Sequence, residues 1–195
     1  ATGEAVLDEY EKVLSIRQQS DQAMAEAKAA HKALLARLQP ENWNTIQEFV
    51  EPLNAIAAQR GHLLTIREYR YIDTDAIDAM GATLQKAHDT VGAATGRFLG
   101  SDSALAPLHA RLAELDAAAQ AAATARALSE QVQAMQAMSA DLDLLSELMA
   151  GLKVDDATER TRVVEALSEV YARLNQARAR AEQRRKSLGS AETVA

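Results

Sequence analysis

The chain has 195 residues and a net charge of −7, with only 8 Gly, 3 Pro and 4% aromatic residues, which favours long helices over a β-sheet protein. It contains no cysteine, which excludes disulfides, thiolate metal sites and cysteine nucleophiles, and fits the reducing cytoplasm, where we expect the protein. No stretch approaches the roughly 18 apolar residues of a membrane span, and the acidic N-terminus is unlike a signal peptide.

Two helices are expected first, over residues 5–38 and 43–69, where apolar residues recur at spacings of three and four. Pro40 separates them, because proline disfavours the helical conformation in the residue before it. Pro52 lies inside the second helix and removes one backbone hydrogen bond. We therefore expect a kink or a split there.

The clearest helical pattern lies in residues 74–99. Asp73 or Thr74 is expected to cap this helix, and Gly100 follows its end. Its apolar positions are spaced 3,4,3,4,3,4, as in a packing seam. They are Ile77, Met80, Leu84, Ala87, Val91, Ala94 and Phe98.

Residues 104–150 are expected to form one helix of roughly 70 Å at about 1.5 Å per residue. Its apolar seam fails at Arg126 and restarts one residue out of phase, which marks a local unwinding or a change of partner helix. A last helix should run over residues 157–188 and end at Gly189. Asp156 is suited to cap its start.

These segments predict an all-α fold, an elongated antiparallel helical bundle or coiled coil of about five helices. We expect one helical domain over residues 1–195. The chain begins with Ala1 rather than a start methionine, and we expect it to be an excised part of a longer protein.

Candidate catalytic and metal-binding residues are sparse. His31, His62, His88 and His109 each lack a histidine or an acid four residues away, so no helical metal pair forms. The run 92–97, GAATGR, lacks the Gly-Lys-Ser/Thr ending of a phosphate loop, and close helix packing explains it better. Paired acids such as Asp141 and Asp143 are best explained by capping and solvation.

One basic cluster is a candidate for contact with phosphate or nucleic acid. Residues 171–188 carry six cations and one acid, a local net charge of +5, which leaves −12 for the rest of the chain. A solvated basic face is the competing explanation, since Glu169 precedes Arg173 at salt-bridge spacing and no aromatic residues interleave. The six cations are Arg173, Arg178, Arg180, Arg184, Arg185 and Lys186.

Two stretches are more distinctive than helical periodicity explains. One is LLTIREYRYID at residues 63–73, and the other is GLKVDDATERTR at 151–162, with YARLNQAR at 171–178 and LGSAE at 188–192. Together they resemble the coiled-coil middle of a family of very large bacterial proteins labelled DNA repair ATPases. Those proteins combine long helices with a separate nucleotide-binding module.

The resemblance implies a non-catalytic helical spacer or docking segment of an ATPase. The family's ATPase motifs have no counterpart here, so ATP and magnesium are implied only for the full-length protein. The implied partners are other domains of the same protein, with self-association through the seams and weak nucleic-acid contact as further expectations and no membrane partner. The alternatives are a stand-alone binding module that uses the basic face and, third, an independent enzyme.

Overall fold

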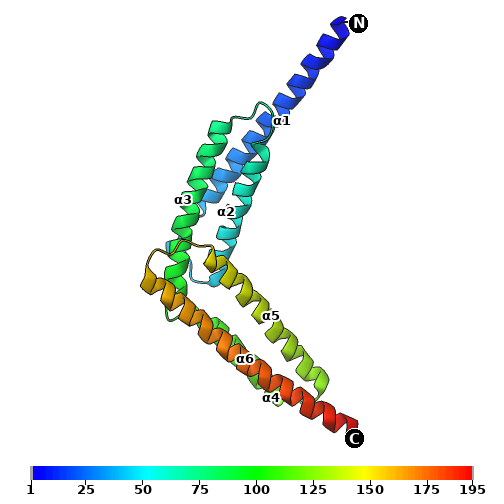
Figure 1. Ribbon diagram of the computed structural model, residues 1–195, viewed down its shortest axis with the longest axis vertical. Helices are drawn as coiled ribbons and strands as arrows, with labels where there is room; N and C mark the ends of the chain where they lie inside the picture. The colour runs from blue at the N-terminus through cyan, green and yellow to red at the C-terminus, as the bar shows by residue number, and fades with distance from the viewer. Residues whose placement is uncertain (1, 195) are drawn as a thin grey trace. The chain divides into compact units, whose positions relative to one another are not determined.

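The structure is a computed structural model that describes the backbone of residues 2–194 and the side chains of residues 2–191. About 85% of the chain is helical, and the described residues contain no strand, so the all-α prediction is confirmed. The elements are α1 (Thr2–Ala36), the 3-10 turn η1 (Pro40–Asn42), α2 (Ile46–Ile66), α3 (Thr74–Leu99), α4 (Ala106–Ala121), α5 (Ala125–Ala150) and α6 (Ala157–Val194) (Figure 1). None of the described helices has a stretch long and apolar enough to cross a membrane.

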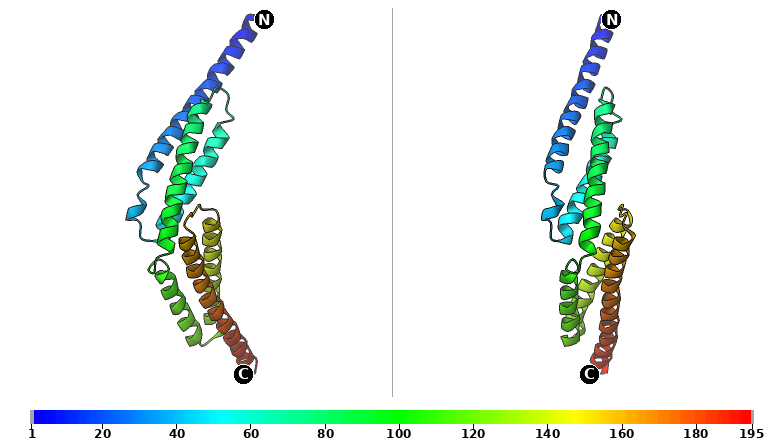
Figure 2. Two further views of the ribbon diagram at one scale, coloured as in Figure 1. Left: turned by 60° about the vertical axis from the view of Figure 1, so that its left-hand side comes forward. Right: turned by 90° about the vertical axis from the view of Figure 1, so that its left-hand side faces the viewer.

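The chain divides into two compact units, Ala1–Gly92 and Ala93–Ala195. In the first unit, α1, α2 and most of α3 lie side by side. In the second unit, α4, α5 and α6 do so, together with the last turns of α3 (Figures 1 and 2). The boundary between the units therefore falls within a continuous helix.

The first unit is built on an antiparallel hairpin of α1 and α2. Arg37 pairs with Glu51 near its closed end, with 2.6 Å between Nη1 and Oε2, and the Gln59 amide donates to the Ala27 carbonyl at 3.3 Å further along. Apolar side chains of α1, α2 and α3 fill the interior. They include Ala27, Leu34, Phe49, Leu53, Ile56, Leu63, Ile66, Ile77, Met80, Leu84 and Val91.

The first four turns of α1 extend beyond this core. Ser20 is the first buried residue along α1, and its hydroxyl donates to the Arg70 carbonyl beyond the end of α2. Before it, Val6, Tyr10 and Leu14 are among the exposed large apolar residues. The predicted seam of the first helix is therefore covered only from its middle onward.

Side-chain caps fix where several helices begin, among them α2, α3 and α6. Asp73 accepts from the Ala76 amide at 3.1 Å, and Asp156 accepts from the Thr158 and Glu159 amides at 2.9 and 3.2 Å. Both caps were predicted, and both are confirmed. At the start of α2, the Thr45 hydroxyl accepts from the Glu48 amide at 3.2 Å, and the Glu48 carboxylate accepts from the Asn44 amide at 3.2 Å, which places the first helical residue at Ile46 rather than at 43.

Two predicted helix boundaries are absent. Helix α2 continues through Pro52, so the split is wrong as an expectation, and the alternative of a kink stays a prediction. Helix α6 also continues through Gly189 to Val194, and the predicted end at 188 is wrong. No described glycine has a positive φ, so Gly189 does not adopt the left-handed conformation that ends many helices.

The largest correction concerns the predicted single helix over residues 104–150, which is two helices, α4 and α5. The chain turns at Ala122, whose ψ of 126° is extended, and Thr124 caps α5 by accepting from the Ala127 amide at 3.1 Å. The change of seam phase near Arg126 is thus the start of a new helix. Residues 2–194 therefore form six α-helices rather than the expected five, and the expected 70 Å helix is absent from them.

The second unit is a three-helix bundle that runs up, down and up. Arg178 of α6 reaches Gln136 of α5, and Tyr171 reaches Asp143, so these two helices run antiparallel. The turn at 122–124 makes α4 and α5 antiparallel as well. The buried apolar residues are Leu112, Leu115, Ala119, Leu128, Met135, Met138, Leu142, Leu145, Val163, Leu167, Val170, Leu174, Ala177 and Ala181.

Candidate functional site

Several side chains of the predicted basic face of α6 contact their own bundle, although Arg173 and Arg180 remain exposed. Arg173 contacts the His109 Nδ1 atom at 3.3 Å, and Arg180 forms two hydrogen bonds to the Asp116 carboxylate, at 2.6 and 3.3 Å. The bond to Asp116 raises the pKa of the Arg180 guanidinium. The sequence placed these arginines on one face correctly, but α4 already lies along that face.

These contacts also show that α4 and α6 run parallel. His109 and Asp116 are seven residues apart, as are Arg173 and Arg180, so the paired positions advance together by one heptad. Side chains that pair at this interval on two helices fix the register of one against the other. The basic residues thus act as a ladder between α4 and α6, which we call the arginine ladder (Arg173, Arg180 and Arg184).

Arg184 completes the arginine ladder at the end of α4. Its Nη2 donates to the Ala122 carbonyl at 2.6 Å, where the last carbonyls of a helix lack partners within the helix. Its Nε atom is buried without a hydrogen-bond partner among the described atoms. The positive charge lies at the negative end of the α4 dipole, a favourable position for a cation.

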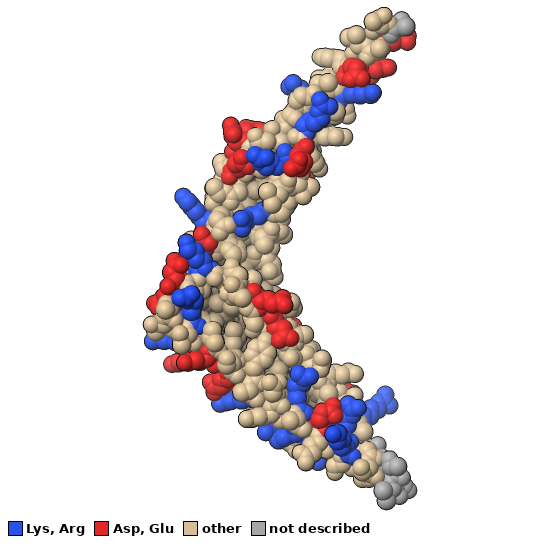
Figure 3. Space-filling model, viewed as in Figure 1, with Lys and Arg blue, Asp and Glu red and all other residues tan. Residues whose placement is uncertain are grey.

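The remaining three cations differ in their surroundings. Arg178 donates to Gln136 of α5 at 2.9 Å, and Arg185 pairs with Glu182 of its own helix at 3.2 Å. Lys186 is exposed and forms no ion pair within the part of the chain that the structure describes. Figure 3 shows basic side chains gathered towards the C-terminal end, with acidic ones among them. Fewer than six cations are therefore available to a polyanion without the loss of an existing contact.

The glycine run in α3 serves helix packing, as predicted. A Cβ atom at Gly96 would lie 3.1 Å from Val154 and 3.2 Å from the Glu159 carboxylate, so a larger residue would require these side chains to shift. Thr95 beside it is buried. The run is helical throughout and packs against the segment that leads into α6.

No described group of three or more histidines and acids could hold a metal ion. His31 and His88 lie in the first unit, where burial lowers the pKa of each imidazole. Asp143 is exposed, and its carboxylate also accepts a hydrogen bond from the Tyr171 hydroxyl at 2.8 Å.

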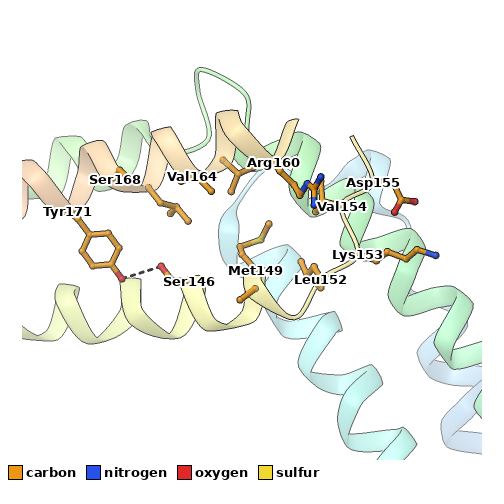
Figure 4. A pocket seen from close by; sticks show the side chains of 13 residues that line it. Ser146, Met149, Leu152, Lys153, Val154, Asp155, Arg160, Val164, Ser168 and Tyr171 are labelled. Atoms are coloured by element: carbon orange, nitrogen blue, oxygen red, sulfur yellow. Dashed lines mark hydrogen bonds between the residues drawn. The ribbon is translucent and has the colours of Figure 1, made fainter. Parts of the chain in front are cut away.

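Sequence reasoning missed a cleft of about 530 Å³ in the second unit. It lies between the last turns of α5, the first turns of α6 and the connecting loop (Figure 4). Its lining residues are Ser146, Met149, Ala150, Leu152, Lys153, Val154, Asp155, Arg160, Val163, Val164, Leu167, Ser168 and Tyr171. No motif signals such a cleft, because it arises from how two helices and a loop pack.

The inner end of the cleft is closed by hydroxyl groups. Tyr171 lies 3.2 Å from the Ser146 hydroxyl and donates to Asp143. Burial raises the pKa of Tyr171, and Asp143 adds to the increase, while the bond to Ser146 opposes it. The phenol is therefore neutral at physiological pH.

The two distinctive sequence stretches occupy two turns. The first, residues 63–73, joins α2 to α3, and there Tyr71 has a φ of 67° with the guanidinium groups of Arg17 and Arg70 4.6 and 5.4 Å from its ring centre. The second, residues 151–162, forms the loop of the cleft and the start of α6.

Residues 103–187 match the family described as a domain of unknown function, DUF7902. The match covers α4, α5 and most of α6, and thus the cleft and the arginine ladder. No curated protein and no solved structure matches the chain.

Proposed function

We propose that the chain is a non-catalytic helical spacer or docking segment of a large bacterial ATPase that acts in DNA repair. The assignment to an ATPase and to DNA repair rests on the resemblance of residues 63–73 and 151–162 to that family. The proposed partners are the other domains of the same protein.

The arginine ladder is the observation that carries the spacer role. A bundle that transmits a displacement must keep its helices in register, and pairs of hydrogen-bonded side chains repeated at heptad steps resist sliding of one helix along another. His109 with Arg173 and Asp116 with Arg180 are such pairs. The Arg184 contact to Ala122 holds the far end of α4 in the same way.

The coding DNA on both sides of the chain tests the ATPase assignment directly. The proposal expects one open reading frame that continues beyond residues 1 and 195 and contains a Gly-Lys-Ser/Thr phosphate loop. A frame without a nucleotide-binding motif would contradict the proposal.

An assay of ATP turnover tests the non-catalytic role. Phosphate release from ATP by the purified chain should not exceed that of a buffer control. Turnover that co-purifies with the protein would contradict the non-catalytic role.

A nucleic-acid-binding module is the second candidate, favoured by the exposed cations at the end of α6. Arg185 and Lys186 lie level with the end of α4 in the register set by the arginine ladder, and both are exposed. Contacts with phosphates release counterions, so such binding should weaken steeply as salt is raised.

Fluorescence anisotropy with labelled single- and double-stranded DNA separates the two candidates. The variant Arg185→Ala with Lys186→Ala removes exposed cations without breaking the arginine ladder, unlike changes at Arg173 or Arg180. The spacer proposal expects weak binding at 50 mM salt that this variant removes. Tight binding at 200 mM salt that the variant abolishes would favour the second candidate.

A further inference from the structure

The cleft between α5 and α6 has the size and shape of a ligand site. Its volume of about 530 Å³ lies within the roughly 300–1,000 Å³ of small-molecule pockets. Arg160 and Tyr171, near its two ends, are eleven residues apart on α6, which corresponds to roughly 16 Å along the helix. The cleft is therefore elongated.

The middle of the cleft is apolar. Met149 and Leu152 line one side, and Val164 and Leu167 line the other (Figure 4). Val164 remains 62% exposed, whereas Met149 and Leu152 are half-buried and Leu167 is buried. Covering Val164 with an apolar ligand would remove that surface from water, at about 25 cal/mol per Å².

The outer end of the cleft carries an excess of positive charge. Lys153 and Arg160 both line it, against the single carboxylate of Asp155. Neither cation forms an ion pair with any residue that the structure describes, whereas Arg173 and Arg180 do. An anionic group held near Arg160 would supply the missing partner.

The opposite end offers only neutral hydroxyl groups. The Tyr171 proton is donated to Asp143, and the Ser146 hydroxyl lies beside the phenol. A second anionic group at this end would face the Asp143 carboxylate and be repelled. The polarity of the cleft therefore favours a ligand that is charged at one end only.

We propose that this cleft binds an anionic amphiphile, with its apolar chain along Met149, Val164 and Leu167 and its carboxylate at Arg160 and Lys153. The ligand class is a single-chain carboxylate, similar in form to a fatty acid. This site does not depend on the spacer role, because it is built within the second unit alone.

Isothermal titration calorimetry of the chain with dodecanoate, below its micelle concentration, tests the site. We expect saturable binding with one molecule per chain. Dodecanol and dodecyltrimethylammonium have the same alkyl chain as dodecanoate but lack its carboxylate, so they should bind at least tenfold more weakly. Equal affinity for the three compounds, or no saturable binding of dodecanoate, would overturn the proposal.

Two cleft variants, each with a control, test where the carboxylate and the alkyl chain of dodecanoate bind. Arg160→Gln with Lys153→Gln should weaken dodecanoate binding at least tenfold, and the exposed Arg126→Gln outside the cleft should not change it. Val164→Asp should abolish binding, and Leu144→Asp, at an equally exposed leucine outside the cleft, should leave it intact. Circular dichroism checks that each variant is folded.

A blocking variant covers the case in which Val164→Asp fails to fold. Ser168→Trp places a large side chain over the cleft from an exposed helical position. Loss of dodecanoate binding in this folded variant would support the site. Undiminished binding in either folded cleft variant would place the ligand elsewhere and contradict the proposal.

Discussion

The two units pack three helices around an apolar core, but the polar contacts between their helices are placed differently. In the first unit, the ion pairs that join two helices lie near helix ends, where Arg37 meets Glu51 and Arg67 meets Asp78. In the second unit, one ion pair, between Arg180 and Asp116, and one hydrogen bond, between Arg173 and His109, lie a heptad apart along α4 and α6. End pairs fix where the chain turns, whereas repeated pairs fix the register of two parallel helices that no short loop connects.

A spectroscopic probe allows the units to be followed separately. Trp43 is the only tryptophan, and its ring packs edge-on against Phe49 with 5.2 Å between ring centres. Its fluorescence therefore reports on the first unit. Helical circular dichroism reports on both units.

Core truncations should have the largest effects and should separate the units. Leu84→Ala in the first unit and Leu174→Ala in the second each remove a side chain that is 0% exposed, and each should cost about 2–5 kcal/mol of unfolding free energy. Urea titration should show the loss by tryptophan fluorescence for Leu84→Ala and by circular dichroism for both.

Exposed leucines provide the matched controls. Leu64→Ala and Leu144→Ala should change the unfolding free energy by no more than about 0.5 kcal/mol, because their side chains are 68% and 65% exposed. Equal losses at the buried and exposed positions would contradict the assignment of the two cores.

Loss of the α5 cap should have the next largest effect. Thr124→Ala removes the acceptor for the Ala127 amide and should destabilise the second unit by about 1 kcal/mol. Thr124→Ser keeps the hydroxyl and should retain most of the stability. If Thr124→Ala and Thr124→Ser were equally stable in urea titrations followed by circular dichroism, the turn at 122–124 would not depend on this cap.

A double-mutant cycle should show that register pairs contribute more than local pairs. Arg180→Gln and Asp116→Asn should couple measurably, because the two side chains form two hydrogen bonds across the α4–α6 interface. The control cycle at Glu182 and Arg185, within one exposed turn of α6, should show little coupling. If the coupling energy between Arg180 and Asp116 equalled that between Glu182 and Arg185, the pair between helices would contribute no more than the local pair, which would contradict the comparison.

Salt sharpens this prediction. The coupling between Arg180 and Asp116 should decrease in 1 M NaCl, where the Debye length is about 3 Å. Coupling that is unchanged by salt would mean that packing, rather than charge, links the two side chains.

Mild acid should have the smallest effect, and it should act on the first unit. Burial lowers the pKa of His31 and His88, so the unfolded chain binds protons more readily than the folded chain below about pH 6.5. The stability from these neutral imidazoles is present above that pH and is lost as the pH falls through the lowered folded values. The tryptophan-detected urea midpoint should therefore decrease between pH 7.5 and 5.5.

Histidine variants identify the source of that decrease. His31→Gln with His88→Gln should reduce the pH dependence, whereas His109→Gln in the second unit should not. A decrease of the same size in the double variant would assign the effect to other groups.

Sequence predicted those parts of the fold that depend on local chemistry. Asp73 and Asp156 cap their helices as expected, because a carboxylate before an apolar periodic run satisfies the free amides of a first turn. The change of seam phase located a defect near Arg126, but a full break at Ala122 was not predicted, since a run of alanines followed by Thr124 contains no proline or glycine and has a high helix propensity.

The site residues were predicted less well because their partners are distant in sequence. Heptad spacing placed Arg173 and Arg180 on one face of α6, but His109 and Asp116 lie 64 residues earlier and meet them only when α4 runs parallel to α6. The cleft depends on the packing of Met149 against Val164 and the loop, which no local pattern encodes.

Distances between nitroxide labels on α4 and α6 test the central claim most directly, because the chain has no native cysteine. Labels at Ala113→Cys and Gln176→Cys, at exposed positions on parallel helices, should lie close together. Labels at Ala113→Cys and Ser187→Cys should lie farther apart, by eleven residues or roughly 16 Å along α6. If residues 104–150 formed one continuous helix antiparallel to α6, the order would reverse, and a shorter distance for the second pair would contradict the parallel register.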